Sequence, residues 1–401
     1  MKKSAMIVLA IFFVLSVLPF SAEAAETGRF SDTSGHWAAA AVRQAVEKGY
    51  VSGYPDGSFK PDQSVTRAEF IRMLADALKL PHEQGGSPWY QPYVAAALEA
   101  GVLVESDFND FTAKISRLEI MRMVSRGLAL EGAYSAYLEA FRGLYNGDLP
   151  FVDFREIPDA DLPYIALAFG AGIVSGYPDA TIGLGRTATR AEAVMMIENL
   201  LRAKGEQPES KQYLQELKEV AETGTNARVM SNLVLLREID PEKIVVEHPS
   251  YTAKLKRVYV LPIEGDTASL YERKFLWNRD EILPQRLENK IAYVIGVLDM
   301  TFKRDLWFDF TVMETYLQPG TSLFAKAGGR YDVPEKKFGF LHMFISESKP
   351  VEKGSTHDVV LYGYYNREES FYVEMQTNHA LSGGYYDLFF NPNKPKPKGS
   401  P

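Results

Sequence analysis

The pattern of apolar and polar residues divides this chain into a helical first half and a strand-rich second half. Apolar residues recur at helical spacing from Trp37 to Lys48 and again from Thr66 to Leu78, which predicts two amphipathic helices. From Ala227 onward, short runs of β-branched and aromatic residues end at Gly, Pro, Asn or Asp, as strands do. We therefore expect a multidomain protein that is all-α at first and then mainly β, as a sandwich or a barrel.

The strand-rich part is expected at residues 226–391, after a helical connector at 205–225. Its strand candidates are the segments 229–236, 243–247, 254–261, 269–276, 291–303, 306–316, 338–345, 358–365, 370–376 and 385–390. The Pro- and Lys-rich end, 392–401, has the composition of a disordered tail.

The first half contains an internal repeat. V-S-G-Y-P-D at 51–56 returns at 174–179, and T-R-A-E at 66–69 returns at 189–192, in both cases 123 positions later. A constant offset of this kind indicates a copied structural unit. A weaker copy keeps W-x11-G and S-R-L-E but lacks the G-Y-P-D turn. We predict repeats at residues 30–80, 88–130 and 151–203, with an extra stretch at 131–150 that contains a short helix near 135–144.

The N-terminal residues resemble an export signal. Lys2 and Lys3 precede an apolar run from Ala5 to Phe20, and Ala22-Glu23-Ala24 fits the small-x-small rule for cleavage. We expect residues 1–24 to be a signal peptide and the mature chain to have no integral membrane segment. An uncleaved membrane anchor is the alternative interpretation.

Composition excludes several classes of function. The net charge of -8 argues against nucleic-acid binding, since an acidic chain repels a polyanion. Cysteine is absent, which rules out disulfides, thiolate metal sites and a cysteine nucleophile. The six histidines lie far apart without metal-ligand spacing. We expect no metal site and no cofactor.

Each repeat contains a Thr/Ser-x-x-Glu box at the start of its second predicted helix. In such a capping box the hydroxyl accepts from the backbone N–H of the Glu, and the carboxylate accepts from the backbone N–H of the Thr or Ser. The three predicted boxes are Thr66 with Glu69, Ser116 with Glu119, and Thr189 with Glu192.

The boxes do not explain three arginines, Arg67, Arg117 and Arg190, each at the first helical position. A cation there faces the positive end of the helix dipole, at a cost of roughly 0.3–1 kcal/mol. Each Arg can pair with a structural carboxylate such as Asp32 or Asp153. It can also bind an anionic ligand, since a guanidinium matches carboxylate or phosphate and helix N-termini attract anions. The residues alone leave both interpretations open.

Other motif residues have two interpretations as well. Gly53 and Gly176 serve a tight connection that needs glycine backbone angles, or they let a ligand approach the backbone. Trp37 and Trp89, at the start of predicted helices, are more often core residues than platforms for a sugar ring.

The order F-x-D, H-W-A, V-S-G-Y-P-D-G-S-F and T-R-A-E-F resembles the surface-layer homology (SLH) domain of bacterial cell-envelope proteins, over residues 30–203. The resemblance implies a pseudo-trimer of three tandem repeats around a central three-helix bundle. It also implies grooves between repeats that bind secondary cell wall polysaccharide, commonly bearing a pyruvate ketal. The implied contacts are Arg67, Arg117, Arg190, Asp32, Asp153, Gly53 and Gly176, and the two indoles, Trp37 and Trp89, are further candidates. Because the second repeat lacks the turn and the aspartate, and the third lacks the Trp, we expect the grooves to differ in binding.

Residues 205–401 carry no motif that points to a reaction. Asp309 and Glu314 are five positions apart, so they face opposite sides of a strand, and no nucleophile-elbow motif is present. We expect an exported protein held non-covalently to the wall of a Gram-positive-type envelope by pyruvylated polysaccharide. Its C-terminal domain has a binding or structural role, with a partner that the sequence does not specify. The alternative is a wall-anchored glycan-processing enzyme with its active site in that domain.

Overall fold

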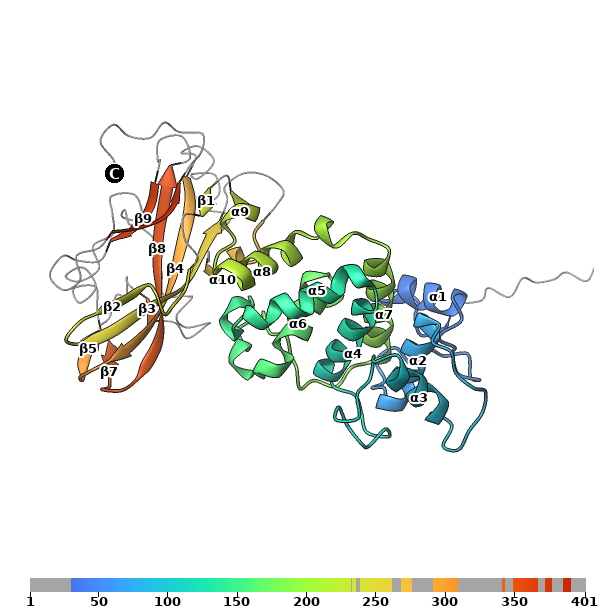
Figure 1. The fold of residues 1–401 in the computed structure, drawn as a ribbon. Coiled ribbons are helices and arrows are strands. Elements are labelled where there is room, and N and C mark those ends of the chain that lie inside the picture. Colours follow the sequence, from blue (N-terminus) through green and yellow to red (C-terminus); the bar gives the residue numbers. More distant parts are fainter. Residues whose placement is uncertain are drawn as a thin grey trace, which may run out of the picture.

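A helical part and a β-sheet part lie side by side in this protein (Figure 1). The computed structural model describes residues 30–231, 233–235, 239–261, 268–275, 291–308, 341–342, 349–366, 372–376 and 385–390. The predicted signal peptide (1–24) and tail (392–401) lie outside this range. Among the described residues, no helix has the length and apolar character needed to cross a membrane.

Each predicted repeat contributes two main helices. They are α1 (Ala39–Glu47) and α2 (Arg67–Leu78), then α3 (Gln91–Glu99) and α4 (Arg117–Ala129), then α6 (Leu162–Gly170) and α7 (Arg190–Lys204). The first helix of each repeat packs on the second helix of another repeat: α1 on α7, α3 on α2 and α6 on α4. The three second helices α2, α4 and α7 also contact one another pairwise, so no repeat has a core of its own.

A ring of backbone hydrogen bonds joins the three repeats just before these second helices. The N–H of Val65 donates to the carbonyl of Ala188 (3.1 Å), that of Ala188 to Ile115 (3.0 Å), and that of Ile115 to Val65 (3.0 Å). The bonds close on themselves, so residues equivalent by sequence occupy equivalent positions around a common centre. This ring brings the three T-R-A-E-type motifs together.

The extra stretch between the second and third repeats folds into α5 (Gly132–Ala140) and the short 3-10 turns η1 (Phe141–Gly143) and η2 (Asn146–Asp148). α5 overlaps the short helix that we predicted near residues 135–144. Two more such turns, η3 (Phe154–Glu156) and η4 (Asp159–Asp161), precede α6.

The connector after the third repeat is also helical. The turn η5 (Pro208–Ser210) leads into α8 (Gln212–Thr223), which packs on α6 and is followed by the short helix α9 (Ala227–Met230). Figure 1 shows α8 between the repeats and the sheets.

The described strands form three sheets. The largest has the order β2-β3-β4-β8-β6, formed by β2 (Val245–Glu247), β3 (Tyr251–Leu261), β4 (Ile291–Phe302), β8 (Thr356–Asn366) and β6 (Leu341–His342). Its pairs are antiparallel except for β6 with β8. A second sheet has the order β1-β10-β9, from β1 (Val234–Leu235), β10 (Tyr385–Phe390) and β9 (Tyr372–Gln376), and β5 (Leu306–Phe308) pairs with β7 (Lys349–Val351). A sandwich or barrel stays a prediction.

Two strand predictions were wrong in whole or in part. Segment 269–276 contains the helical turn α10 (Glu272–Phe275) instead of a strand. The Ser269 hydroxyl accepts from the N–H of Tyr271 at the start of this turn. Tyr271 and Phe275 are four positions apart, a spacing that places both rings on one face of a helix. Segment 229–236 is a strand only at its end, since α9 occupies its start, and β7 was not predicted. The predicted strand residues 309–316, 338–340 and 343–345 lie outside the described range.

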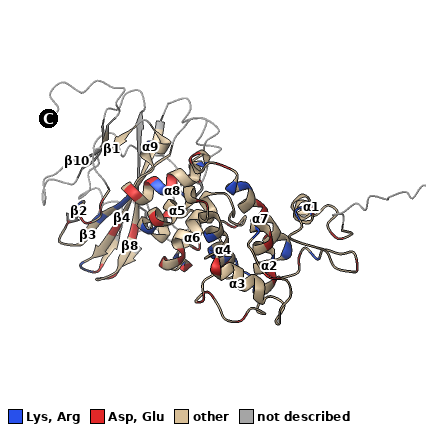
Figure 2. Cartoon of the chain, turned by 45° about the vertical axis from the view of Figure 1, so that its right-hand side comes forward, with Lys and Arg blue, Asp and Glu red and all other residues tan. Residues whose placement is uncertain are grey.

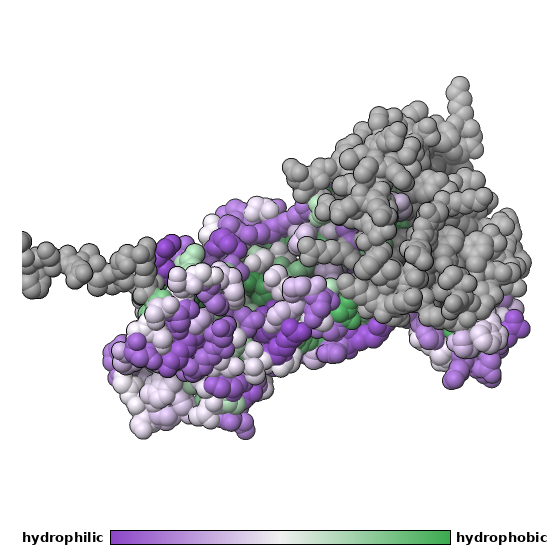
Figure 3. Space-filling view, turned by 180° about the vertical axis from the view of Figure 1, so that it is seen from behind, coloured by the Kyte–Doolittle hydropathy of each residue, from purple (hydrophilic) through white to green (hydrophobic). Residues whose placement is uncertain are grey.

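Charged residues of both signs are interspersed over the helical part (Figure 2). In the view from behind, its described surface is mainly hydrophilic, with hydrophobic residues in small areas only (Figure 3). In the view of Figure 2, the described helical part shows no broad basic face of the kind that binds nucleic acid.

Candidate functional site

All three predicted capping boxes are formed. Thr66 accepts from the N–H of Glu69 at 3.2 Å, and the Glu69 carboxylate accepts from the N–H of Thr66 at 2.7 Å. The boxes at Ser116 and Thr189 have the same reciprocal bonds. They place the three arginines at the first positions of α2, α4 and α7.

The backbone N–H groups at these helix starts are already occupied. The N–H of Arg67 donates to Ala113, that of Arg117 to Arg186 and that of Arg190 to Gln63, each a carbonyl of another repeat at 2.9–3.0 Å. An anion at these positions therefore has to be bound by the guanidinium groups rather than by the backbone at the start of the helix.

Two of the arginines pair with a carboxylate from the capping box of another repeat. Arg67 donates to one oxygen of Glu119 through Nε (3.1 Å) and Nη2 (2.5 Å). Arg117 lies with Nη1 3.6 Å from Glu192, and its side chain is only 5% exposed. The partners are thus capping-box glutamates and not Asp32 or Asp153, which we named as examples.

Arg190 lacks such a partner. Its Nε donates to the carbonyl of Phe59 (3.0 Å) and its Nη2 to that of Ser52 (3.1 Å). Arg117 makes the two equivalent bonds, to Ile182 and Ser175. Within the described part of the chain, however, no carboxylate lies within 4.0 Å of Arg190, and its Nη1 makes no hydrogen bond.

Burial lowers the pKa of Arg190, while Tyr54, Glu69 and Asp32 act in the opposite direction. Arginine nevertheless stays protonated in proteins, so Arg190 is a buried cation. Its guanidinium carbon lies 4.6 Å from the ring centre of Phe59 and 5.0 Å from that of Tyr54, but among the described residues no contacting carboxylate offsets its lost hydration. Such a group favours an anionic ligand.

The orientation of one glutamate distinguishes Arg117 from Arg190. The hydroxyl of Tyr177 donates to Oε1 of Glu192 at 3.0 Å, and this same oxygen lies near Arg117. The equivalent residues in the first repeat are Tyr54 and Glu69. Among the described contacts no hydrogen bond joins those two, and Glu69 instead directs one oxygen to both the N–H and the hydroxyl of Thr66.

Arg190 lines a groove with a volume of about 240 Å³ to which all three repeats contribute. Its other lining residues are Tyr50, Val51, Ser52, Gly53, Tyr54, Glu69, Arg72, Met73 and Trp89. Arg72 adds a second cation, 52% exposed, with Nε 3.7 Å from Asp76. The groove thus combines a buried cation, an exposed cation, one carboxylate and an indole.

Both candidate indoles are exposed, so the expectation of core residues was wrong for both. Trp37 is 59% exposed and Trp89 is 49% exposed. Only Trp89 lines the groove beside Arg190. Trp89 begins the second repeat, which lacks the G-Y-P-D turn, so the turn and the indole of this groove come from different repeats.

Gly53 and Gly176 do not have the positive φ angles that favour glycine. Both positions require glycine because a neighbouring ring leaves no room for a side chain. A Cβ on Gly53 would lie 2.1 Å from the ring of Phe30, and one on Gly176 would lie 2.8 Å from the ring of Phe151. The aromatic residue of each F-x-D motif therefore occupies the space beside the glycine. Left-handed backbone is found instead at Gly57, where φ is 80°.

The F-x-D aspartates fix the turn. Asp32 accepts from the N–H groups of Phe59 (2.8 Å) and Lys60 (2.7 Å), and Asp153 accepts from Ile182 and Gly183 (both 2.9 Å). Although partial burial acts in the opposite direction, the bonds to Asp32 lower the pKa of this carboxyl. Asp32 thus shapes the backbone beside the groove, because the carbonyl of Phe59 accepts from Arg190. Asp153 does the same at Ile182, whose carbonyl accepts from Arg117.

The sequence interpretation missed Glu69, Arg72 and Tyr54 as groove residues. Glu69 was assigned only to its capping box, although the threefold repetition of Arg with Glu was the available signal for cross-pairing between repeats. Arg72 has an equivalent in the second repeat, Arg122, six positions after the capping residue, whereas the third repeat has Met195 there, so the sequence held a partial signal that was not used.

The described residues include no group of three or more His, Cys, Asp or Glu placed to hold a metal ion. Of the acids considered for catalysis, Asp309 and Glu314 lie outside the described range.

The sequence profile of the S-layer homology domain family matches residues 29–71 and 150–194, the first and third predicted repeats. The chain carries S-layer homology domains. The second repeat, at 88–130, stays a prediction from its shared capping box and helix order.

Known proteins with similar sequences are much longer than the aligned regions. An amylopullulanase of Thermoanaerobacterium thermosulfurigenes is 28% identical over 44% of this chain and 10% of its own length. The S-layer protein EA1 of Bacillus anthracis is 26% identical over 46% of this chain and 21% of its own length. A cellulosome-anchoring protein of Acetivibrio thermocellus is 32% identical over 31% of this chain and 28% of its own length. The chain therefore covers less than a third of the length of each of these relatives.

Proposed function

We propose that residues 30–203 anchor this protein non-covalently to the bacterial cell surface, and that the groove around Arg190 is its principal binding site. The ligand that we propose is a secondary cell wall polysaccharide bearing a pyruvate ketal. The observation that carries the proposal is a buried arginine with no carboxylate partner among the described residues, set in a groove beside an exposed indole. The names of the relatives, an S-layer protein and a cellulosome-anchoring protein, support the location.

The chemistry of the groove favours a carboxylated sugar. A guanidinium with Nε and Nη2 held by carbonyls keeps Nη1 in place for a ligand carboxylate, and charge-assisted bonds of this kind are stronger than neutral ones. Trp89 offers an apolar face to a sugar ring. The lone carboxylate of Glu69 and the backbone at Gly53 offer acceptors for sugar hydroxyl groups.

The three grooves are unequal in this proposal. Arg67 and Arg117 stay predicted contacts, but a ligand carboxylate there competes with Glu119 or Glu192. The repeats then form the pseudo-trimer typical of the family, with α2, α4 and α7 as its central bundle, and one groove provides most of the affinity.

The mature protein is exported to a Gram-positive-type wall and displays its C-terminal domain there in a binding or structural role. A glycan-processing activity of that domain stays the alternative.

Sedimentation with purified walls tests the proposal. The protein is expected to co-sediment with untreated walls and to stay in the supernatant with walls from which pyruvate has been removed by mild acid. Equal binding to both preparations would show that the ligand is the neutral part of the polymer.

A further inference from the structure

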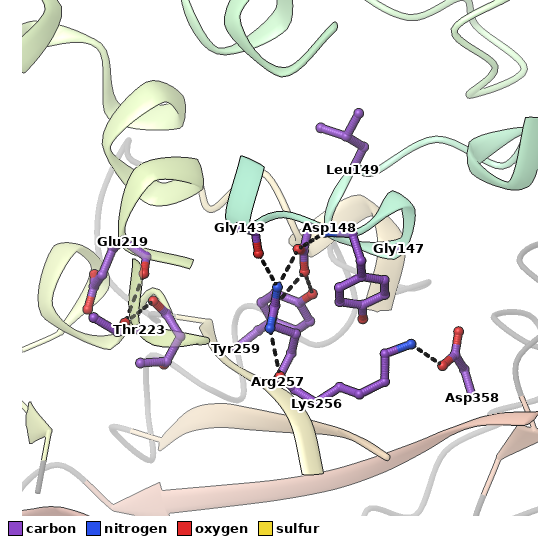
Figure 4. Close-up of polar contacts among 12 residues, drawn as sticks. Gly143, Gly147, Asp148, Leu149, Glu219, Thr223, Lys256, Arg257, Tyr259 and Asp358 are labelled. Carbon is purple, nitrogen blue, oxygen red and sulfur yellow. Dashed lines mark hydrogen bonds and ion pairs between the residues drawn. The ribbon is translucent and has the colours of Figure 1, made fainter. Parts of the chain in front are cut away.

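The extra stretch between the second and third repeats contacts the C-terminal sheet through buried charges (Figure 4). Asp148, in η2, is fully buried. Both of its oxygens accept from Arg257 on β3, at 2.9 Å from Nε and 3.0 Å from Nη2. The Tyr259 hydroxyl adds a bond of 2.7 Å, and the backbone N–H of Tyr145 adds one of 2.8 Å. The carboxylate is thus surrounded by donors, two of which come from the strand.

Backbone carbonyls of the same stretch accept bonds from the C-terminal part as well. Arg257 donates to Gly143 through Nη2 at 2.8 Å. Lys274, on α10 and 1% exposed, donates to Gly147 and, at 3.1 Å, to Leu149. These carbonyls belong to η1, η2 and the residues that follow, which are otherwise short turns with few internal bonds.

The connector helix α8 is joined to the same strand. Glu216 is fully buried and accepts from Ser269 (2.7 Å) and Asn226 (3.1 Å). The Asn226 amide in turn bonds to both backbone groups of Val260, at 2.7 Å and 3.1 Å. These bonds join α8 to β3, and because α8 packs on α6, the third repeat is in contact with β3 through the connector.

The burial pattern of β3 shows where the sheet meets the helices. Buried and half-buried residues alternate from Tyr251 to Lys256, as they do on a sheet with one solvated face, whereas every residue from Arg257 to Leu261 is buried. The pairing with β4 shifts register between Leu255 and Arg257. The bulge therefore lies where the strand passes from solvent to contact with the helical part.

One apolar cluster also extends across both parts. It includes residues of the repeats together with Tyr259, Leu261, Leu270, Tyr271, Phe275, Ile295, Val297 and Val360 of the C-terminal part. A flexible tether between two independent domains would leave two separate clusters.

We infer that residues 131–150 form a docking platform for β3, and that the repeats and the C-terminal domain unfold as one cooperative unit held in a fixed orientation. The inference does not depend on what the groove binds. Removal of Asp148 leaves the Arg257 charge buried without its partner, which destabilises both parts because the bonds are shared between them.

Hydrogen exchange of the full mature chain across a urea series tests this inference, with mass spectrometry following peptides from α4, α7, β3 and β4. In the parent protein all four are expected to lose protection at one urea midpoint. Earlier loss in β3 and β4 than in α4 and α7 would overturn the inference.

The variant Asp148→Asn is expected to lower the midpoint of all four peptides by the same amount. Tyr259→Phe, which removes a single hydroxyl bond to Asp148, is expected to lower the midpoint of all four peptides by a smaller amount. This variant replaces Asp148→Asn in the test if Asp148→Asn does not fold. Glu242→Gln is the matched control, since Glu242 pairs with Lys254 at 2.7 Å on the exposed part of β3, and no shift is expected. A shift confined to β3 and β4 in either test variant would contradict a shared unit.

Discussion

Three arginines that occupy the same position of one motif have different surroundings in this protein. Arg67 and Arg117 contact capping glutamates of other repeats, whereas Arg190 contacts backbone carbonyls and the rings of Tyr54 and Phe59 but no carboxylate among the described residues. The sequence predicted the position of each arginine through the capping boxes. It could not predict the pairing, because this depends on which oxygen of a distant Glu turns toward the guanidinium.

At the residue scale, the two equivalent indoles provide a matched pair of variants. Trp89→Ala is expected to weaken wall binding about 5- to 10-fold, since it removes an exposed aromatic contact in the groove. Trp37→Ala removes an indole of comparable exposure that does not line this groove, and parent affinity is expected. The affinity of each variant for purified walls is measured from its binding isotherm. Equal losses in the two variants would argue that the binding site is not confined to the Arg190 groove.

At the scale of elements, capping chemistry and apolar spacing predicted the helix starts well, because both depend on residues a few positions apart. The G-Y-P-D turn was predicted for a different reason from the one observed. Two roles were expected for Gly53, unusual backbone angles or the close approach of a ligand, whereas the structure shows that the ring of Phe30 leaves no room for a Cβ there. A contact between residues 23 positions apart cannot be read from the turn itself. The α10 error has the same origin, since the Ser269 hydroxyl that bonds the N–H of Tyr271 also contacts Glu216, far away in sequence.

Gly53→Ala is expected to destabilise the protein by about 1–3 kcal/mol, because the new methyl group would overlap the Phe30 ring. Gly185→Ala is the control, since a Cβ there meets no atom within 4 Å and its backbone needs no positive φ. Urea unfolding followed by circular dichroism gives the free energy of unfolding of both. A Gly53→Ala variant as stable as the parent would mean that the ring moves aside without cost.

At the scale of the whole molecule, the sequence divided the chain correctly into a helical part followed by a part with antiparallel sheet. It did not show that the two parts share one apolar cluster or that residues 131–150 contact the sheet. The ion pair of Asp148 and Arg257 joins positions 109 residues apart, and nothing in either local pattern marks it. Long-range polar contacts of this kind depend on the folded arrangement.

Two buried groups in this interface predict an unusual pH dependence. Burial raises the pKa of Glu216 to about 7, although hydrogen bonds from Ser269, Gln212 and Asn226 act to lower this pKa. Burial lowers the pKa of Lys274 to about 7, with Asp148 and Asp358 opposing the shift and Arg155 and Lys256 adding to it.

Because the pKa of Glu216 is raised on folding, its contribution to stability is full below its ordinary value of 4.5 and is lost as pH rises through about 7. Because the pKa of Lys274 is lowered, its contribution is full above its ordinary value of 10.5 and is lost as pH falls through about 7. Together they predict that these groups stabilise the protein least near pH 7.

We expect Glu216→Gln to remove most of the loss in free energy of unfolding between pH 5 and pH 7, on the order of 1–3 kcal/mol. Lys274→Met is expected to leave that loss in place and to remove the gain above pH 7. Urea unfolding of the parent and both variants at a series of pH values measures the slopes. Parallel curves for parent and Glu216→Gln would exclude Glu216 as a source of the dependence.

The central claim, that Arg190 binds the carboxylate of the wall polymer, is tested most directly by calorimetry of purified polysaccharide with and without its pyruvate. We expect removal of pyruvate to weaken binding to the parent roughly 10- to 100-fold, the effect of one lost charge-assisted contact. Arg190→Gln, shown to be folded by circular dichroism, is expected to bind both polymers equally weakly. If Arg190→Gln loses as much affinity as the parent when pyruvate is removed, the carboxylate is bound by another group and the claim is wrong.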